Sequence, residues 1–244
     1  MVFPQFKNKH KGEALFHPED YVRYWKYPEN LPKKYVIVYS PGVLNYFKKK
    51  YHPRKIRIDS HTDVYVHKGI GVLRMKGVGS PHSGMILEEL IGRGGKEFLN
   101  VGLAGGLQKE GVFLCTKALR DEGTSHHYLP HGRFAYPDNG LTKKLGNALK
   151  GVGLKYSDGI TWTIDAPYRE TKKEIKHYHR EGISTVEMET SALFAIAKYR
   201  KVKIAAAFIV SDVLGNKWEP NFHKLDVKRG LRLMVDASID CLRN

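Results

Sequence analysis

Acidic residues, cysteines and long apolar runs are all scarce in this chain of 244 residues. Asp and Glu number 25 against 41 Lys and Arg, so the formal charge is +16 and an acidic, self-solvating chain is excluded. The two cysteines, Cys115 and Cys241, are too few for a disulfide framework or a four-thiolate zinc site. No apolar run approaches the roughly 20 residues that span a bilayer, and the first residues lack the apolar core of a secretion signal. We therefore expect a cytoplasmic protein with no membrane partner.

The remaining composition predicts a folded chain with a sizeable core, because 41% of the residues are hydrophobic. No repeat and no linker rich in Gly, Ser or Pro divides it. Prolines and lysines punctuate the first 30 residues, which we interpret as an N-terminal arm (1–30) packed on one domain (31–244).

Short apolar runs alternate with helical patterns along this domain. The runs of strand length cover residues 35–39, 64–75, 98–104, 112–119 and 204–210. Helices are expected over 82–95, with Ser80 as cap and Met85 on the apolar face, over 188–201 and over 224–243. Most of the strands are too apolar for one exposed face, which predicts the α/β class with a sheet covered on both sides.

A glycine-rich segment, Asn100 to Gly106, is interpreted as a turn after a strand, where backbone N–H groups can approach an anion or a sugar. It matches neither the dinucleotide pattern nor a triphosphate loop. Tight packing of the backbone against a neighbouring element is an equal alternative.

Two further patterns indicate ligands that we do not expect to be the main ones. His126, His127 and His131 suggest a metal, but adjacent strand residues point to opposite faces and no cysteine is near, so no metal site is expected. Basic residues interleave with aromatic ones, as in nucleic-acid readers, yet the chain lacks the signature of any such module.

Carboxylates follow two apolar segments. Glu187 and Glu189 stand between a strand and a helix, and Asp212 ends an apolar strand. Ligands of open α/β sheets collect at such strand ends, so these acids are candidates for a functional site. The alternatives are a cap at Asp212 and a solvent-facing Glu187.

Taken in order, several motifs resemble the nucleoside phosphorylase superfamily, which includes uridine phosphorylases, hexameric purine nucleoside phosphorylases and methylthioadenosine nucleosidases. The motifs are Ser-Pro-Gly at 40–42, Gly-Val-Gly-Ser-Pro at 77–81, Val-Gly-Leu-Ala-Gly-Gly at 101–106, Asp-Glu-Gly-Thr-Ser at 121–125, the loop at 161–170, Val-Glu-Met-Glu at 186–189 and Val-Ser-Asp at 210–212. The resemblance extends from about Phe16 to the end of the chain and implies a twisted, mixed, partly closed sheet surrounded by helices.

The resemblance also implies a site and a role for each of its residues. Glu189 would hold the ribose hydroxyls, Met188 would lie against the sugar, and Asp212 would protonate a purine leaving group. The other positions are His17, which would reach the sugar from a neighbouring subunit, Arg169, Tyr168 and Glu187 beside the base, and Gly42, Asn100 and Gly102 around the acceptor. Active sites would then be shared within a homo-oligomer, either a dimer or a trimer of dimers.

These residue types suit cleavage of an N-glycosidic bond, which builds positive charge on the sugar and negative charge on the base. A fixed carboxylate near the ribose and a proton donor near the base lower that barrier together. We therefore expect a nucleoside phosphorylase or nucleosidase of nucleoside catabolism, with no cofactor and with phosphate or water as co-substrate. A non-catalytic ligand-binding member of the fold and a basic nucleic-acid-binding protein are the alternatives.

Departures from the family pattern concern the acceptor and the base. Asn100 and Leu103 replace an arginine and a hydroxyl residue, and Tyr46 replaces the arginine expected after Gly42, so a phosphate would lose charge-assisted bonds. Arg74, Lys76 or His82 could substitute for them. Asp212 favours purines whereas Arg169 favours pyrimidines, which leaves the base open.

Overall fold

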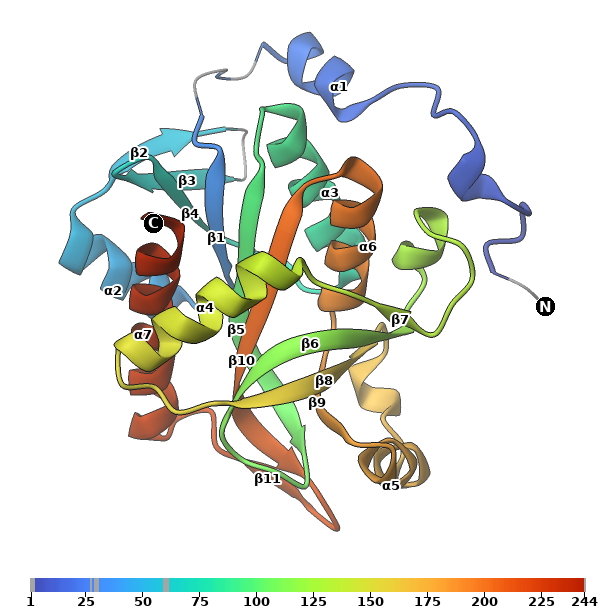
Figure 1. Ribbon diagram of the computed structural model, residues 1–244, viewed down its shortest axis with the longest axis vertical. Helices are drawn as coiled ribbons and strands as arrows, with labels where there is room; N and C mark the ends of the chain where they lie inside the picture. The colour runs from blue at the N-terminus through green and yellow to red at the C-terminus, as the bar shows by residue number, and fades with distance from the viewer. Residues whose placement is uncertain (1–2, 27, 29–30, 59–61, 244) are drawn as a thin grey trace.

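One continuous sheet forms the centre of the molecule, and helices cover both of its faces (Figure 1). The computed structural model describes residues 3–26, 28, 31–58 and 62–243. The strands are β1 (Lys34–Val38), β2 (Arg54–Arg57), β3 (Asp63–His67), β4 (Ile70–Arg74), β5 (Glu97–Leu107), β6 (Val112–Asp121), β7 (Phe134–Ala135), β8 (Ser157–Ile164), β9 (Ile183–Glu187), β10 (Lys203–Leu214) and β11 (Trp218–Pro220).

Part of the sheet closes on itself. The order β10-β6-β8-β9-β5 returns to β10, because β5 and β10 also pair, in parallel and over most of their lengths. Strands β1, β4, β3 and β2 extend the sheet from β5, while β11 extends it from β10. The predicted α/β fold with a twisted, mixed, partly closed sheet is confirmed, and the closure brings the ends of β5, β9 and β10 together.

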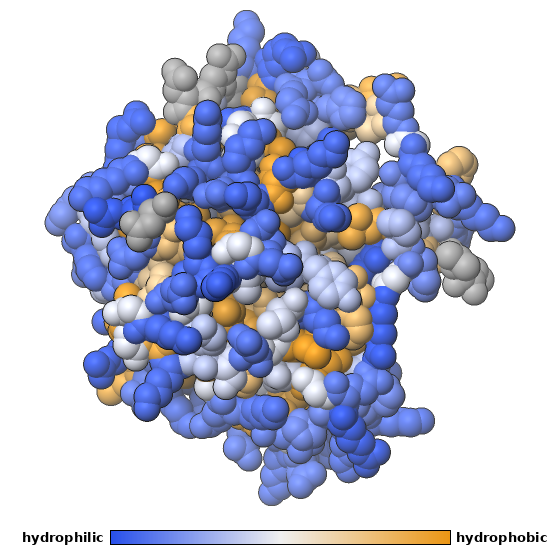
Figure 2. All heavy atoms as spheres, viewed as in Figure 1, coloured by the Kyte–Doolittle hydropathy of each residue, from blue (hydrophilic) through white to orange (hydrophobic). Residues whose placement is uncertain are grey.

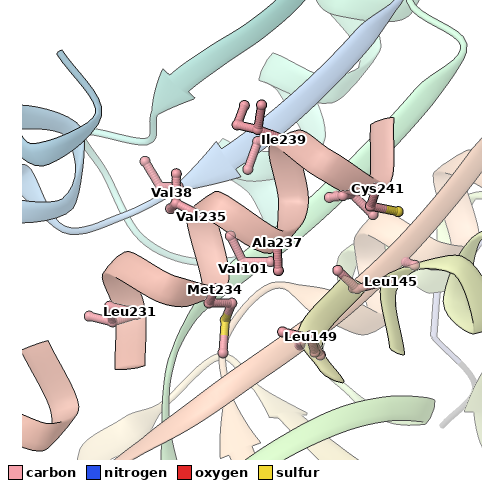
Figure 3. Close-up of a cluster of buried hydrophobic side chains, with 14 of the residues drawn as sticks. Val38, Val101, Leu145, Leu149, Leu231, Met234, Val235, Ala237, Ile239 and Cys241 are labelled. Atoms are coloured by element: carbon pink, nitrogen blue, oxygen red, sulfur yellow. The ribbon is translucent and has the colours of Figure 1, made fainter. Parts of the chain in front are cut away.

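Three helices cover one face of the sheet: α2 (Pro41–Tyr51), α4 (Asn139–Gly151) and α7 (Leu225–Arg243). Their apolar sides pack against β1, β5 and β10, as the cluster around Met234, Val235 and Leu145 shows (Figure 3). The outer sides carry mostly hydrophilic residues (Figure 2). No described helix has both the length and the apolar character needed to cross a membrane.

Helices α3 (Ser80–Gly92) and α6 (Thr190–Arg200) cover the other face, and α5 (Lys172–Arg180) packs near β9. Arg200 of α6 joins Glu88 of α3 through two short contacts, from Nε to Oε2 at 2.7 Å and from Nη2 to Oε1 at 3.0 Å. This ion pair fixes the two helices to each other, and both helices begin beside the candidate site.

Three local expectations differ from the structure. The segment 64–75 is a hairpin rather than one strand, because Lys68 and Gly69 both adopt positive φ and turn the chain between β3 and β4. The cap of α3 is Gly79, with Ser80 already inside the helix. Met85 is 53% exposed, since the apolar face of α3 turns the other way.

The N-terminal segment runs along the outside of the molecule before entering β1 (Figure 1). It contains a short 3-10 helix (Lys9–Lys11) and the seven-residue α1 (Pro18–Tyr24), which packs on α3. Residues 1–2, 27, 29–30, 59–61 and 244 lie outside the described residues, so the division into an arm (1–30) and a domain (31–244) stays a prediction.

Candidate active site

A cavity of about 510 Å³ lies at the ends of β1, β5, β9 and β10, beside the first turn of α2. Glu187, Met188, Glu189 and Asp212 all line it, as does Gly102. The closed part of the sheet therefore brings together carboxylates at or near the ends of β9 and β10. The strand that was expected to end at Asp212 continues to Leu214.

The charged side chains described in the cavity wall are all acidic. They are Glu170, Glu187, Glu189 and Asp212, and none of the described lining residues is a lysine, an arginine or a histidine. In a chain of charge +16, this is a concave surface that disfavours an anion and suits a ligand with hydroxyl, amino or cationic groups.

Glu189 is only 7% exposed and stands at the start of α6. Its Oε1 accepts a hydrogen bond of 2.6 Å from the backbone N–H of Gly79, whose φ of 97° favours glycine. Ser80 Oγ donates to the carbonyl of Met188 at 2.8 Å, which ties the start of α3 to the same segment. Burial and the neighbouring Glu187 charge raise the pKa of Glu189 to about 7.

Glu187 has a different environment. Its Oε2 accepts hydrogen bonds from the N–H of Glu189 (2.9 Å) and from the N–H and Oγ1 of Thr190 (both 2.7 Å), while its Oε1 accepts one from Thr163 Oγ1 at 2.6 Å. Burial raises its pKa, although these donors oppose the rise. The carboxylate is thus held at the N-terminus of α6, and its predicted contact with a base stays a prediction.

Asp212 owes its position to a bulge in β10. The pairing with β5 skips Ser211, so that Val210 faces Ala104 and Asp212 faces Gly105. Ser211 Oγ donates to Asp212 Oδ1 at 2.7 Å, and Trp218 Nε1 of β11 donates to Oδ2 at 2.8 Å. Both carboxylate oxygens therefore accept a hydrogen bond from the chain itself.

The glycine-rich segment is part of β5 rather than a turn. A side chain at Gly105 would collide with Leu214, and one at Gly106 with the backbone of Lys109, so tight packing explains these two glycines. Gly102 lines the cavity and lies against the ring of Tyr39.

Asn100 is buried and lies outside the cavity wall. Its Oδ1 accepts from the Tyr39 hydroxyl at 2.9 Å, and its Nδ2 donates to Thr190 Oγ1 at 3.2 Å. Burial and the charges of Glu189 and Glu187 raise the pKa of Tyr39, so its hydroxyl keeps the proton that it donates to Asn100. Asn100 thus holds Tyr39, which lines the cavity, without lining it itself.

Four other predicted positions lie outside this wall in the described chain. Tyr168 is 99% exposed and Arg169 is also exposed, while Gly42 lies on the outer side of α2. His17 is the N-cap of α1, where its N–H donates to Asp20 Oδ2 at 2.9 Å. One protomer therefore does not bring these residues to its own cavity, and their roles stay predictions.

The candidate cations are not in the wall either. Arg74, Lys76 and His82 are absent from the described lining, and His82 Nε2 accepts from the N–H of Gly77 at 3.3 Å. Tyr46 turns away and donates to Asp236 at 2.8 Å, so the first side chain after Gly42 that lines the cavity is the apolar Val43.

Sequence reasoning missed Glu170, which lines the cavity together with Pro167 and Asp212. Burial and the charges of Asp212 and Glu174 raise its pKa to about 7. The signal was available, because Glu170 ends the loop at 161–170 that carries the family resemblance.

The histidine pattern does not form a metal centre in the described residues, which contain no group of three His, Cys, Asp or Glu side chains able to hold an ion. His126 and His127 lie on a 3-10 helix (Thr124–His127) rather than a strand. The Nη2 of Arg120 lies 3.3 Å from His126 Nδ1, a contact that opposes binding of a cation there.

Comparisons with known proteins agree with this geometry. Residues 35–241 match the model of the phosphorylase superfamily. The chain is 28% identical to a uridine phosphorylase of Treponema pallidum over 76% of its length and 80% of the relative's. It is 32% identical to a DeoD-type purine nucleoside phosphorylase of Bacillus thuringiensis over 73% of its length and 79% of the relative's.

Solved structures share the fold. An AMP nucleosidase of Bacteroides thetaiotaomicron superposes with a TM-score of 0.77 at 23% identity, covering 94% of this chain and 99% of that one. A uridine phosphorylase of Vibrio fischeri superposes with a TM-score of 0.76 at 23% identity, covering 88% and 92%.

Proposed function

The chain belongs to the phosphorylase superfamily, and from that premise we propose that it cleaves the bond between the sugar and the base of a nucleoside, with water as the acceptor. The observation that carries the proposal is the acidic cavity, where Glu189 and Met188 share a wall with Asp212 and no cationic side chain is present among the described lining residues. The names of its relatives include both phosphorylases and a nucleosidase.

Glu189 is assigned to the sugar. One of its oxygens accepts from Gly79, which leaves the other to accept hydrogen bonds from ribose hydroxyls. As the glycosidic bond breaks, positive charge grows on the sugar, and a nearby carboxylate stabilises the transition state more than the ground state. Met188 adds an apolar surface that excludes water from the sugar face without leaving a polar group unpaired.

Asp212 is assigned to the base. It lies two residues before the end of β10 in the same cavity, held by Ser211 and Trp218 in an orientation fixed by the bulge. A base leaves with the electron pair of the broken bond, and a proton delivered to it lowers the barrier. This favours a purine, which offers a ring nitrogen to that proton.

Water is preferred over phosphate as the acceptor for an electrostatic reason. A phosphate dianion needs several charge-assisted hydrogen bonds, each worth roughly 1.5–3 kcal/mol. The cavity offers Val43, Leu103 and backbone amides at the start of α2, together with four carboxylates that repel an anion. A neutral water molecule needs no such clamp.

We also propose that a second copy of the chain completes the site. Leu15 is fully exposed and Phe16 is 65% exposed, next to His17, which lies outside its own protomer's cavity. Val78, 69% exposed, is itself part of the cavity wall. Such apolar exposure beside a site is typical of a subunit interface.

The acceptor is tested by incubating the protein with a panel of nucleosides, with and without inorganic phosphate, and identifying the sugar product. We expect release of free base and free ribose at equal rates in both conditions, and loss of that release in Asp212→Asn. Ribose 1-phosphate formed only in the presence of phosphate would overturn the choice of water. If no nucleoside releases its base, the proposed activity is refuted and the alternative of a non-catalytic ligand-binding protein is favoured.

A further inference from the structure

We propose that the outer face of α2, α4 and α7 binds the phosphate backbone of double-stranded DNA without reading its base sequence. This basic face consists of the exposed lysine and arginine side chains of the three helices that cover one side of the sheet (Figure 1). None of these side chains is among the described residues that line the acidic cavity, so the inference does not depend on the proposed activity.

Positive charge is concentrated on these three helices. They make up less than a fifth of the chain, but they carry ten Lys and Arg against three Asp, a net charge of +7 out of the total of +16. All ten basic residues are exposed: Lys48, Lys49, Lys50, Lys143, Lys144, Lys150, Lys228, Arg229, Arg232 and Arg243. A surface with such an excess of one sign attracts a polyanion and speeds its encounter with the protein.

The three aspartates leave most of this charge free. Asp236 is buried, and its carboxylate accepts hydrogen bonds from Lys50 at 2.7 Å and from two tyrosine hydroxyls at 2.8 Å. Asp240 lies 3.9 Å from Arg243, and Asp226 stands in the first turn of α7. The other eight cations have no ion-pair partner among the described residues, so they are available to phosphate groups.

Two hollows flank α7 and extend the basic face along it. One hollow of about 490 Å³ is lined by Lys49 of α2 and Arg232 of α7. The other, of about 620 Å³, is lined by Lys144 of α4 and Arg243 of α7. The 19 residues of α7 span about 28 Å, which is roughly the length of eight base pairs of a duplex. Cations spread over this length match a row of phosphates better than one small anion.

The apolar character of the basic face is low, which distinguishes between kinds of polyanion. Among the described residues of the three helices, Leu225 is the one large hydrophobic residue that is exposed. The ring of Tyr46 is covered by Lys50 Nζ at 5.5 Å and by the guanidinium of Arg232 at 5.4 Å. Single strands are bound by aromatic side chains that stack on bases, and membrane-surface helices insert apolar side chains. The basic face therefore suits a duplex, which presents phosphates and keeps its bases stacked inside.

The hydrogen-bonding capacity of these side chains favours DNA over duplex RNA. Duplex RNA is recognised largely through its 2′-hydroxyl groups, which both donate and accept hydrogen bonds. Lysine and arginine side chains only donate, and the phosphate oxygens of DNA only accept. Contacts of this kind hold the protein on the duplex and carry no sequence information.

The test measures binding of a short labelled DNA duplex by fluorescence anisotropy as a function of salt. We expect the wild-type protein to lose roughly a hundredfold in affinity between about 50 and 200 mM salt, as four or more phosphate contacts require. The triple variant Lys49→Gln, Lys144→Gln, Arg232→Gln removes one cation from each helix. It should bind at least about tenfold more weakly at low salt, and the slope of log affinity against log salt should become shallower by about 2–3.

The matched control removes three charges elsewhere. Lys172, Lys173 and Lys176 of α5 are exposed, and α5 packs near β9 rather than on the basic face. Their joint replacement by Gln causes the same change of net charge and should leave the affinity for DNA within about threefold of the wild type. The single variants Lys49→Gln and Lys144→Gln should each make the slope shallower by about 0.9, which tests the basic face even if the triple variant unfolds.

Several results would overturn the inference. These are no binding of the duplex by the wild type, equal loss of affinity in the two triple variants, or tighter binding of single-stranded DNA, duplex RNA or vesicles of anionic lipid than of the DNA duplex. Nucleoside cleavage by the basic-face variants should match that of the wild type. DNA binding without cleavage would support this inference and refute the proposed function, and cleavage without DNA binding would do the reverse.

Discussion

The folded chain surrounds Glu187 and Glu189, two positions apart, with different hydrogen-bond donors. Glu187 accepts hydrogen bonds from backbone and hydroxyl donors around the start of α6. Glu189 accepts one from Gly79 and is buried beside the Glu187 charge. The donors around Glu187 offset the cost of burying its charge, whereas Glu189 has fewer donors and is a cost of the site.

This difference gives a prediction for Glu189→Gln. Activity should fall about a hundredfold or more, because the neutral amide cannot stabilise charge on the sugar.

The raised pKa of Glu189 means that folding opposes its ionisation. The resulting cost is absent below its unfolded pKa, near 4.5, and grows until the pH passes about 7. At pH 8 the variant should therefore unfold with a free energy about 1–3 kcal/mol higher than the wild type, whereas at pH 4 the two should agree. Urea unfolding at both pH values measures this, and a destabilised variant at pH 8 would contradict it.

The pH dependence of base release follows from Glu189. This carboxyl group must be ionised to stabilise the sugar, and its pKa is about 7, so the rate should rise with pH through that region. We expect kcat/KM to rise several-fold between about pH 6 and pH 8 and then to level off. A flat profile over this range would refute the assignment of Glu189 to the sugar.

At the scale of single residues, the sequence predicted which acids belong to the site. It did not predict the hydrogen bonds and the burial of each one. The Val-Glu-Met-Glu motif and Asp212 were found because carboxylates at the ends of apolar strands are conspicuous. The hydrogen bonds that separate Glu187 from Glu189 come from Thr163 and Gly79, which are distant along the chain. Glu170 was missed because a glutamate in a polar loop shows no contrast with its neighbours.

Among the elements, α6 depends on a cap that lies outside the helix. Glu187 accepts from the N–H groups of Glu189 and Thr190, the first of the unpaired donors at this N-terminus. Asn100 and Tyr39 continue the network through Thr190 Oγ1. The start of α6, and Met188 and Glu189 with it, is thereby fixed against β1 and β5.

We therefore predict that Glu187→Gln destabilises the protein. An amide replaces one acceptor oxygen with a donor, which would face N–H and hydroxyl donors in a buried place, at a cost of about 1–3 kcal/mol. Glu189→Gln is the matched control, because the same chemical change two residues away should have the opposite sign at pH 8. Denaturant unfolding of both variants decides the point, and equal shifts in one direction would show that the cap has no such role.

The hydrophobic patterns of the sequence predicted where strands and helices occur better than how the strands pair. The apolar runs at 98–104 and 204–210 lie in β5 and β10, and the helix expected over 224–243 is α7. The bulge at Ser211 and the pairing of β5 with β10 were not predictable, because they depend on residues about a hundred positions apart. Those two features aim Asp212 into the cavity.

For the whole molecule, charge separates the exterior from the cavity. The chain carries +16 overall, with lysines and arginines on the outer sides of α2, α4 and α7, while the cavity wall is acidic. Composition excluded an acidic chain, but it cannot show where charges lie. The basic exterior attracts anions, whereas the cavity suits a neutral or cationic ligand.

The last prediction concerns how many copies of the chain form one site. His17 does not line its own cavity, and the exposed Leu15 and Phe16 beside it favour contact with another protomer. His17→Ala and Glu189→Gln should each be nearly inactive alone. After denaturation and refolding as a mixture, a dimer that exchanges His17 across its interface should recover about a quarter of the wild-type activity, because half of the dimers are mixed and one of their two sites is intact. Each variant refolded alone is the control. An active monomer in light scattering, or mixed dimers that form without recovered activity, would show that His17 and Glu189 do not meet in a shared site.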